Sequence, residues 1–245
     1  MTTPAETPLT YEFMAGVVPP SSSPTFTLRF PHELGPFRPT SLNIDADVAA
    51  HLTIETIQVG ANEQLASPSC VPASLFSPQH VEDDLYFDLV PSSRILSITV
   101  RNHLKEPKTF RCEVTGRHNF DRIGQAGHGC ALGLGWNIVE PGKTIVLRVQ
   151  PQLVLAPNRL HLPAEVLEHF TICSAEKHST SNLKSSTDAV SPEKLAKENL
   201  AAGGRGFCLE PNVVLSPSHY LTIVVTNDSG SSRPFTGAVV GKLLA

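Results

Sequence analysis

Apolar and polar residues alternate with a period of two along several short stretches of this chain. In TFTLRF (25–30), phenylalanine and leucine alternate with threonine and arginine, which is typical of a β-strand buried on one face. Strand patterns of the same kind occur in SLNID, LTIETIQV, LYFDLV, RILSITVRN and TFRCEVTG. Within LTIETIQV the alternation predicts that Leu52 and Ile54, and then Ile57 or Val59, face inward, with one irregularity between them.

The last two of these strands have the most regular pattern. Ile98 and Val100 share one face of their strand, and Phe110, Cys112 and Val114 share one face of the next. HLKEPK between them predicts a polar hairpin loop, and VPASLF (71–76) predicts at most a short helical turn.

The strand pattern occurs twice in the chain. Seven of 16 positions in 39–54 recur at an offset of 118, and seven of 21 in 96–116 recur at an offset of 125. Chance would give about one identity per window, at roughly 6 to 7% per position. The identical pairs are Pro39 and Pro157, Leu42 and Leu160, Ala46 and Ala164, Val48 and Val166, His51 and His169, Thr53 and Thr171, Ile54 and Ile172, Leu96 and Leu221, Ile98 and Ile223, Val100 and Val225, Asn102 and Asn227, Phe110 and Phe235, Val114 and Val239, and Gly116 and Gly241.

This duplication predicts an all-β protein with two tandem antiparallel β-sandwich, jelly-roll-like units of six or seven strands each. We expect a flexible N-terminal arm (1–24), a first unit (25–117), a Gly-rich linker (118–135) and a second unit (136–245). The second unit carries a polar insertion (176–206), in which Pro192 to Ala202 predict a short surface helix.

The positions that the two copies share are expected to be structural, the polar ones and the glycines included. Asn102 and Asn227 stand where a strand ends and suit an Asx-type turn. The paired glycines would close their strands, where a positive φ suits glycine. His51 and His169 predict turn or strand-edge residues that bond the backbone, because the pattern brings no carboxylate or second imidazole close to them.

Composition narrows the function classes. Only 17% of residues are charged, the formal net charge is −4, and no Lys/Arg cluster exceeds two residues. These features argue against a direct nucleic-acid site and against a polybasic membrane contact. The sequence shows neither a signal-peptide pattern nor an apolar stretch of 18 residues, so we expect synthesis in the cytoplasm without membrane insertion. Five scattered cysteines indicate reduced thiols.

Few residues suggest chemistry, and no cofactor is predicted. His118, Asp121, His128 and Cys130 are of types that bind zinc, but their spacing matches no closed zinc site, and a flexible connector is the better interpretation. The chain lacks the G-x-S-x-G, H-E-x-x-H and Walker motifs. Trp136, the sole tryptophan, suits packing between the units or a ligand contact equally well.

In arrangement, the duplicated sandwich resembles the compact double jelly-roll major capsid proteins of certain icosahedral viruses. The resemblance covers residues 17–117 and 136–242 and is one of size, duplication and strand pattern. It implies a non-enzymatic subunit that self-assembles, as a trimer of pseudo-sixfold shape, into a virion or an intracellular shell. Two alternatives stay open: a soluble module that binds a carbohydrate or small ligand near Trp136, and a metal-dependent enzyme that uses the linker His/Cys set.

Overall fold

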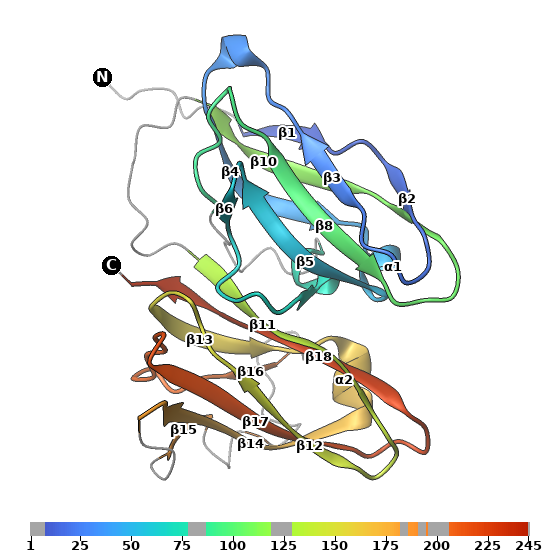
Figure 1. Ribbon diagram of the computed structural model, residues 1–245, viewed down its shortest axis with the longest axis vertical. Helices are drawn as coiled ribbons and strands as arrows, with labels where there is room; N and C mark the ends of the chain where they lie inside the picture. The colour runs from blue at the N-terminus through green and yellow to red at the C-terminus, as the bar shows by residue number, and fades with distance from the viewer. Residues whose placement is uncertain are drawn as a thin grey trace.

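The computed structural model describes residues 8–77, 87–118, 129–181, 186–190, 195 and 206–244 (Figure 1). The chain is an all-β protein of two units, and the strand pairs in the described residues are antiparallel. Figure 1 shows the first unit above the second, with β11 and β18 lying along the junction between them.

The second unit has the strand order of an eight-stranded jelly roll. One sheet has the order β11-β18-β13-β16, and the other has the order β12-β17-β14-β15. Helix α2 connects β13 to β14. The elements are β11 (Gly129–Val139), β12 (Thr144–Val149), β13 (Leu155–His161), α2 (Ala164–His169), β14 (Phe170–Ser179), β15 (Ser186–Val190), β16 (Gly206–Cys208), β17 (His219–Asn227) and β18 (Arg233–Leu243).

The first unit repeats this order. Its sheets are β1-β10-β4, which Val90 extends by an isolated bridge to Phe37, and β3-β8-β5-β6. β2 pairs with β9, and β7 pairs with β5. The elements are β1 (Leu9–Glu12), β2 (Gly16–Val18), β3 (Thr25–Leu28), η1 (His32–Leu34), β4 (Phe37–Ile44), α1 (Ala46–Ala49), β5 (Leu52–Val59), β6 (Asn62–Glu63), β7 (Val71–Pro72), η2 (Ala73–Phe76), β8 (Leu96–Asn102), β9 (Lys108–Phe110) and β10 (Cys112–His118).

The jelly-roll fold therefore agrees with the sequence, but the expected six or seven strands per unit are too few. The second unit already has eight strands in its described residues, β11 to β18. β16 spans only three residues, and β6 in the first unit spans two, so neither is long enough to show a period.

The described part of the expected N-terminal arm is built into the first unit. β1 pairs with β10 from Leu9↔Gly116 to Glu12↔Glu113, and β2 pairs with β9. Main-chain pairing along a sheet edge and the burial of Phe13 and Val18 in the first core hold this segment. Such pairing is largely independent of the polar, Pro-rich sequence that suggested an arm. Residues 1–7 lie outside the described part of the chain.

The segment expected to be a linker is partly strand. His118 ends β10, and residues 129–135 belong to β11, while 119–128 lie outside the described residues. Of the insertion at 176–206, the structure describes the end of β14, β15, Leu195 and the start of β16. The short helix expected at 192–202 therefore falls, apart from Leu195, outside the described residues.

Buried apolar side chains of the described residues form two clusters, essentially one per unit. The inward-facing residues predicted for β8, β9 and β10 are fully or almost fully buried. In β5 the register shifts between Ile54 and Thr56, so a bulge brings both Ile57 and Val59 to the inside together with Leu52 and Ile54. The irregularity predicted from the sequence is this bulge.

The repeated apolar residues take equivalent places in the two cores. Leu42 of β4 and Leu160 of β13 are both buried, and each lies opposite the repeated valine of the neighbouring strand. Ile54 of β5 and Ile172 of β14 are buried in the same way, each opposite the repeated valine of β8 or β17. The register of β14 also shifts directly after Ile172, so the second unit carries the same bulge as β5. These pairs therefore occupy the same positions in the core of each unit.

The repeated asparagines make the same hydrogen bonds in both units. Asn102 Oδ1 accepts from the Leu104 amide at 2.9 Å, and its Nδ2 donates to the carbonyls of Val18 (3.0 Å) and Glu106 (2.7 Å). Asn227 is bonded in the same way to Ser229 N–H (2.9 Å) and to the carbonyls of two residues, Val139 (2.8 Å) and Ser231 (2.9 Å). Each side chain thus forms the predicted Asx turn and also ties its hairpin to the end of another strand, β2 in the first unit and β11 in the second.

The repeated prolines and glycines are partners across the sheet. Pro39 faces Gly116 at a register shift between β4 and β10, and Pro157 faces Gly241 at one between β13 and β18. Neither glycine has a positive φ, and neither closes its strand, contrary to the expectation. A Cβ at either position would collide with backbone of the neighbouring strand, so close approach is what requires glycine.

His51 and His169 also occupy equivalent places. The carbonyl of His51 accepts a hydrogen bond from His103 N–H at 3.4 Å, and that of His169 accepts from Asp228 N–H at 2.9 Å. In each unit the donor follows the repeated asparagine, so the backbone of the histidine anchors the same hairpin. Helix α1 ends two residues before His51 and helix α2 ends at His169, and the two helices lie on the same side of the molecule (Figure 1).

Within the described residues, none of the helices has the length and apolar character needed to span a bilayer.

Candidate functional site

The junction between the units is built on β11 and β18, which are buried on both faces over residues 129–134 and 235–241. Along β18, Phe235 and Val239 point into the second core, whereas Ala238 and Val240 belong to the cluster of the first. Ala131 of β11 also joins the first cluster. One sheet layer therefore serves the core of its own unit and the packing between the units, and a strand buried on both faces shows no alternation.

The segment between β6 and β7 of the first unit covers this layer through its backbone. Ala66 N–H donates to the Ala131 carbonyl at 2.8 Å, and Gly135 N–H donates to the Cys70 carbonyl at 3.2 Å. A Cβ at Gly133 would collide with the carbonyls of Ser69 and Cys70. The glycines of the expected linker thus allow the two backbones to approach closely.

Trp136 packs at the same junction. Its ring stacks on His103, which follows β8, with centroids 3.7 Å apart and planes 5° from parallel. His103 Nε2 is 2.8 Å from Thr53 Oγ1. Burial and, secondarily, the nearby Arg101 lower the pKa of His103 to about 4, so the stacked ring is neutral at pH 7. The sequence left two roles open for Trp136, packing between the units or a ligand contact. Its stack on His103 of the first unit is packing between the units.

The first unit presents the equivalent face, formed by β1, β10 and β4, without such a cover in the described residues. The row Glu12–Glu113–Asn43 crosses these strands, and the corresponding row of the second unit is Gly133–Ala238–His161. Ala238 and His161 are fully buried, whereas Glu12 and Glu113 are exposed and Asn43 is half-buried. The covered face of the second unit thus carries a small apolar residue where the exposed face of the first unit carries a glutamate, as expected for a buried and an exposed surface.

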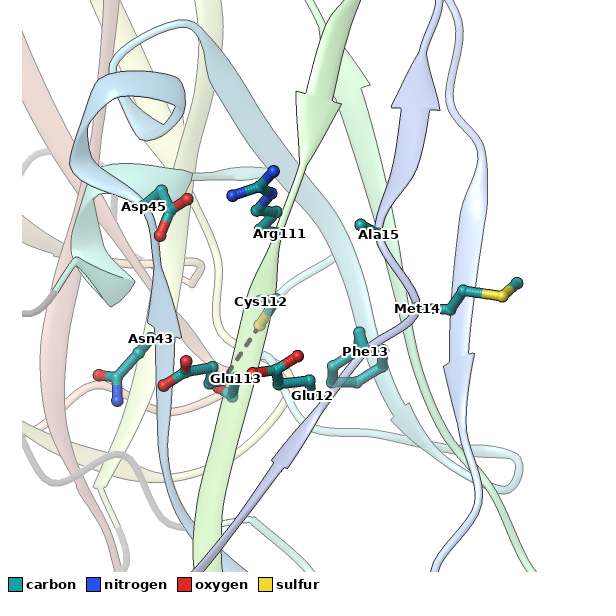
Figure 2. Close-up of a pocket in the computed structure, with 9 residues that line it drawn as sticks. All are labelled: Glu12, Phe13, Met14, Ala15, Asn43, Asp45, Arg111, Cys112 and Glu113. Carbon is teal, nitrogen blue, oxygen red and sulfur yellow. Dashed lines mark hydrogen bonds between the residues drawn. The ribbon is translucent and has the colours of Figure 1, made fainter.

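A cavity of about 520 Å³ opens at this row (Figure 2). Its polar lining comes from Glu12, Asn43, Asp45, Arg111 and Glu113. In Figure 2 the carboxylates of Glu12 and Glu113 lie together on one side of the cavity, and Asp45 and Arg111 lie on the other. We call this cavity the acidic hollow, because three carboxylates and one guanidinium give it a net negative charge, which favours a cationic group.

The cysteine that lines the acidic hollow has an unreactive thiol. Cys112 is buried, and its thiol lies 3.6 Å from the Glu113 carbonyl. Burial raises the pKa of this thiol far above its ordinary value, and the charges of Glu113 and Asp45 raise it further. The thiol therefore stays protonated and is a poor nucleophile.

The predicted zinc-type residues are not brought together in the part of the chain that is described. His118 is buried, with Nδ1 2.9 Å from the Gly35 carbonyl and Nε2 2.8 Å from the Tyr11 hydroxyl. The carbonyl can only accept, so Nδ1 carries the proton and Nε2 accepts from the phenol. Cys130 is buried in β11, and burial raises the pKa of its thiol to about 12.

The other two members of that set, Asp121 and His128, lie outside the described residues. Among the residues that are described, no group of three or more His, Cys, Asp or Glu side chains is arranged to hold a metal ion.

The strand pattern along the sequence does not predict the acidic hollow. Its polar residues come from the end of β1, the β4–α1 corner and the start of β10, and they are up to 101 positions apart. Only the pairing of β1 with β10 brings Glu12 beside Glu113, and the sequence predicted an unpaired arm there. A comparison of outward positions between the two copies could have found it, since Glu113 aligns with Ala238 at the repeat offset.

Comparisons with known proteins give structural resemblance only. No protein-family model matches the chain, and no curated protein matches it. Among solved structures, the chain is similar to the major capsid protein P2 of bacteriophage PM2, with 7% identity, a TM-score of 0.39 and coverage of 95% of this chain and 98% of that chain.

Two other solved structures are similar at lower TM-scores. A fucolectin from striped bass (Morone saxatilis) serum has 12% identity, coverage of 94% of this chain and 86% of that chain, and a TM-score of 0.23. A secreted protein of Eubacterium rectale, described as putative, has 8% identity, coverage of 90% and 68%, and a TM-score of 0.27. With TM-scores this low, the jelly-roll assignment rests on the strand order of the chain itself.

Proposed function

We propose that this chain is a non-enzymatic structural subunit that assembles with copies of itself into a shell of the virus-capsid type. The observation that carries the proposal is the way the two jelly rolls meet. The outer sheet face of the second unit is buried under the β6–β7 segment of the first, and the equivalent face of the first unit is uncovered in the described residues.

Such a contact joins unlike surfaces of two like units. After such a heterologous contact has formed, each unit still has one of the two contact surfaces free. Repetition of the contact therefore gives closed rings or open filaments. Three chains with two units each would supply six similar units, so a closed trimer would have a pseudo-sixfold outline. Synthesis in the cytoplasm followed by assembly into a virion or intracellular shell suits this role.

Size-exclusion chromatography followed by negative-stain electron microscopy tests the proposal. We expect a peak larger than one chain, containing flat particles with a near-sixfold outline or closed shells built from them. Particles of single-chain size at every concentration tried would refute it.

A further inference from the structure

We infer that the outer face of β1, β10 and β4 is the surface on which a second copy of this chain docks, and that the acidic hollow lies within that interface. The inference rests on the proposed function and adds to it the surface and its chemistry.

The contact inside the chain is the template for this assignment. Glu113 of β10 occupies the position in the first unit that Ala238 of β18 occupies in the second. Glu12 pairs with Glu113 across the sheet, just as Gly133 pairs with Ala238. Gly133 lies directly against the backbone of Ser69 and Cys70 from the other unit. If the relation between the units is repeated once, the next unit meets the first at the row Glu12–Glu113–Asn43.

The chemistry of the face distinguishes the two contacts. Within the chain, alanine, valine and glycine are covered permanently, as in a core. On the first unit the aligned positions carry glutamate and threonine, and Met14 at the rim of the acidic hollow is 84% exposed. A polar face that also presents an exposed methionine suits a contact that forms after the chain has folded.

The charge of the acidic hollow also predicts the nature of its occupant. Glu12, Asp45 and Glu113 outnumber the single Arg111 that lines it. The side chain that the second copy places there should be cationic, and the association should weaken as salt screens this attraction.

Substitutions on this face test the inference. Glu113→Lys reverses the charge in the middle of the row, and Thr115→Trp adds bulk to the same outward side of β10. Matched controls are Glu168→Lys, exposed on α2, and Thr27→Trp, exposed on β3. Sedimentation velocity over a concentration series measures the dissociation constant of each oligomer, and thermal unfolding verifies that each variant is folded.

We expect Glu113→Lys and Thr115→Trp to raise the dissociation constant at least about tenfold, with both controls within about twofold of wild type. Wild-type association that both face variants retain unchanged would overturn the docking face and leave the proposed function standing. A wild-type chain that never associates would instead overturn the proposed function, so the two failures are distinguishable.

Discussion

At the scale of single residues, the duplication preserves hydrogen-bonding positions as well as core residues. Asn102 and Asn227 are fully buried, and each uses its amide to satisfy one backbone N–H and two backbone carbonyls. A buried polar group without a partner is costly, so these networks stabilise the fold only while every member is present.

Asn102→Ala should lower the free energy of unfolding by about 2–4 kcal/mol, because it leaves three backbone groups without their partner. Urea unfolding measures the change. Asn62→Ala, at an exposed position in β6, is the control and should stay within about 0.5 kcal/mol of wild type. An Asn102→Ala protein whose free energy of unfolding is as close to wild type as that of the control would show that the Asn102 network does not stabilise the fold.

His103 should make stability depend on pH. Its pKa is about 4 in the folded chain, below its ordinary 6.5, so the unfolded chain binds this proton more readily. The contribution of the neutral ring is complete above pH 6.5 and is lost as pH falls toward 4. Urea unfolding followed by the fluorescence of Trp136 reports on the junction directly.

The variant His103→Phe keeps a ring against Trp136 and removes the titration. We expect its free energy of unfolding to fall less than that of wild type between pH 6.5 and 4. Parallel pH profiles for the two proteins would contradict the assignment of His103.

At the scale of elements, edges and close approaches shape both units. β1 and β2 lie at sheet edges of the first unit, and the paired Pro39 and Gly116 mark the register shift between β4 and β10. Glycine is needed there because the strands come too close for a side chain, not because of a left-handed backbone.

Gly116→Ala should destabilise the chain by about 1–3 kcal/mol, since the added methyl group must displace backbone of β4. Gly230→Ala, where nothing lies near the new methyl group, should change stability by less than about 0.5 kcal/mol. Differential scanning calorimetry compares both with wild type. A Gly116→Ala protein as stable as wild type would mean that β4 and β10 are not this close.

The sequence predicted what depends on local periodicity. The bulge in β5, the inward faces of β8 and β10 and the Asx turns each follow from residues close together in the chain. β1 and β11 were missed for different reasons: β1 is held by main-chain pairing, and β11 is buried on both faces and rich in glycine. The acidic hollow depends on the β1–β10 pairing, which brings Glu12 beside Glu113 and which the strand pattern of the sequence did not predict.

At the scale of the whole molecule, the two copies differ in what covers their outer sheet faces. Both units have the same strand order, but only the second has its outer sheet face buried within the described chain. The first unit keeps the equivalent face polar and hollowed, which we interpret as the surface where chains meet.

The native mass measured by light scattering across a concentration series tests this account most directly. We expect the mass to rise with concentration to three times the 26.4 kDa of one chain, or to larger multiples if shells close. A mass of 26.4 kDa at every concentration, from a folded protein, would contradict it.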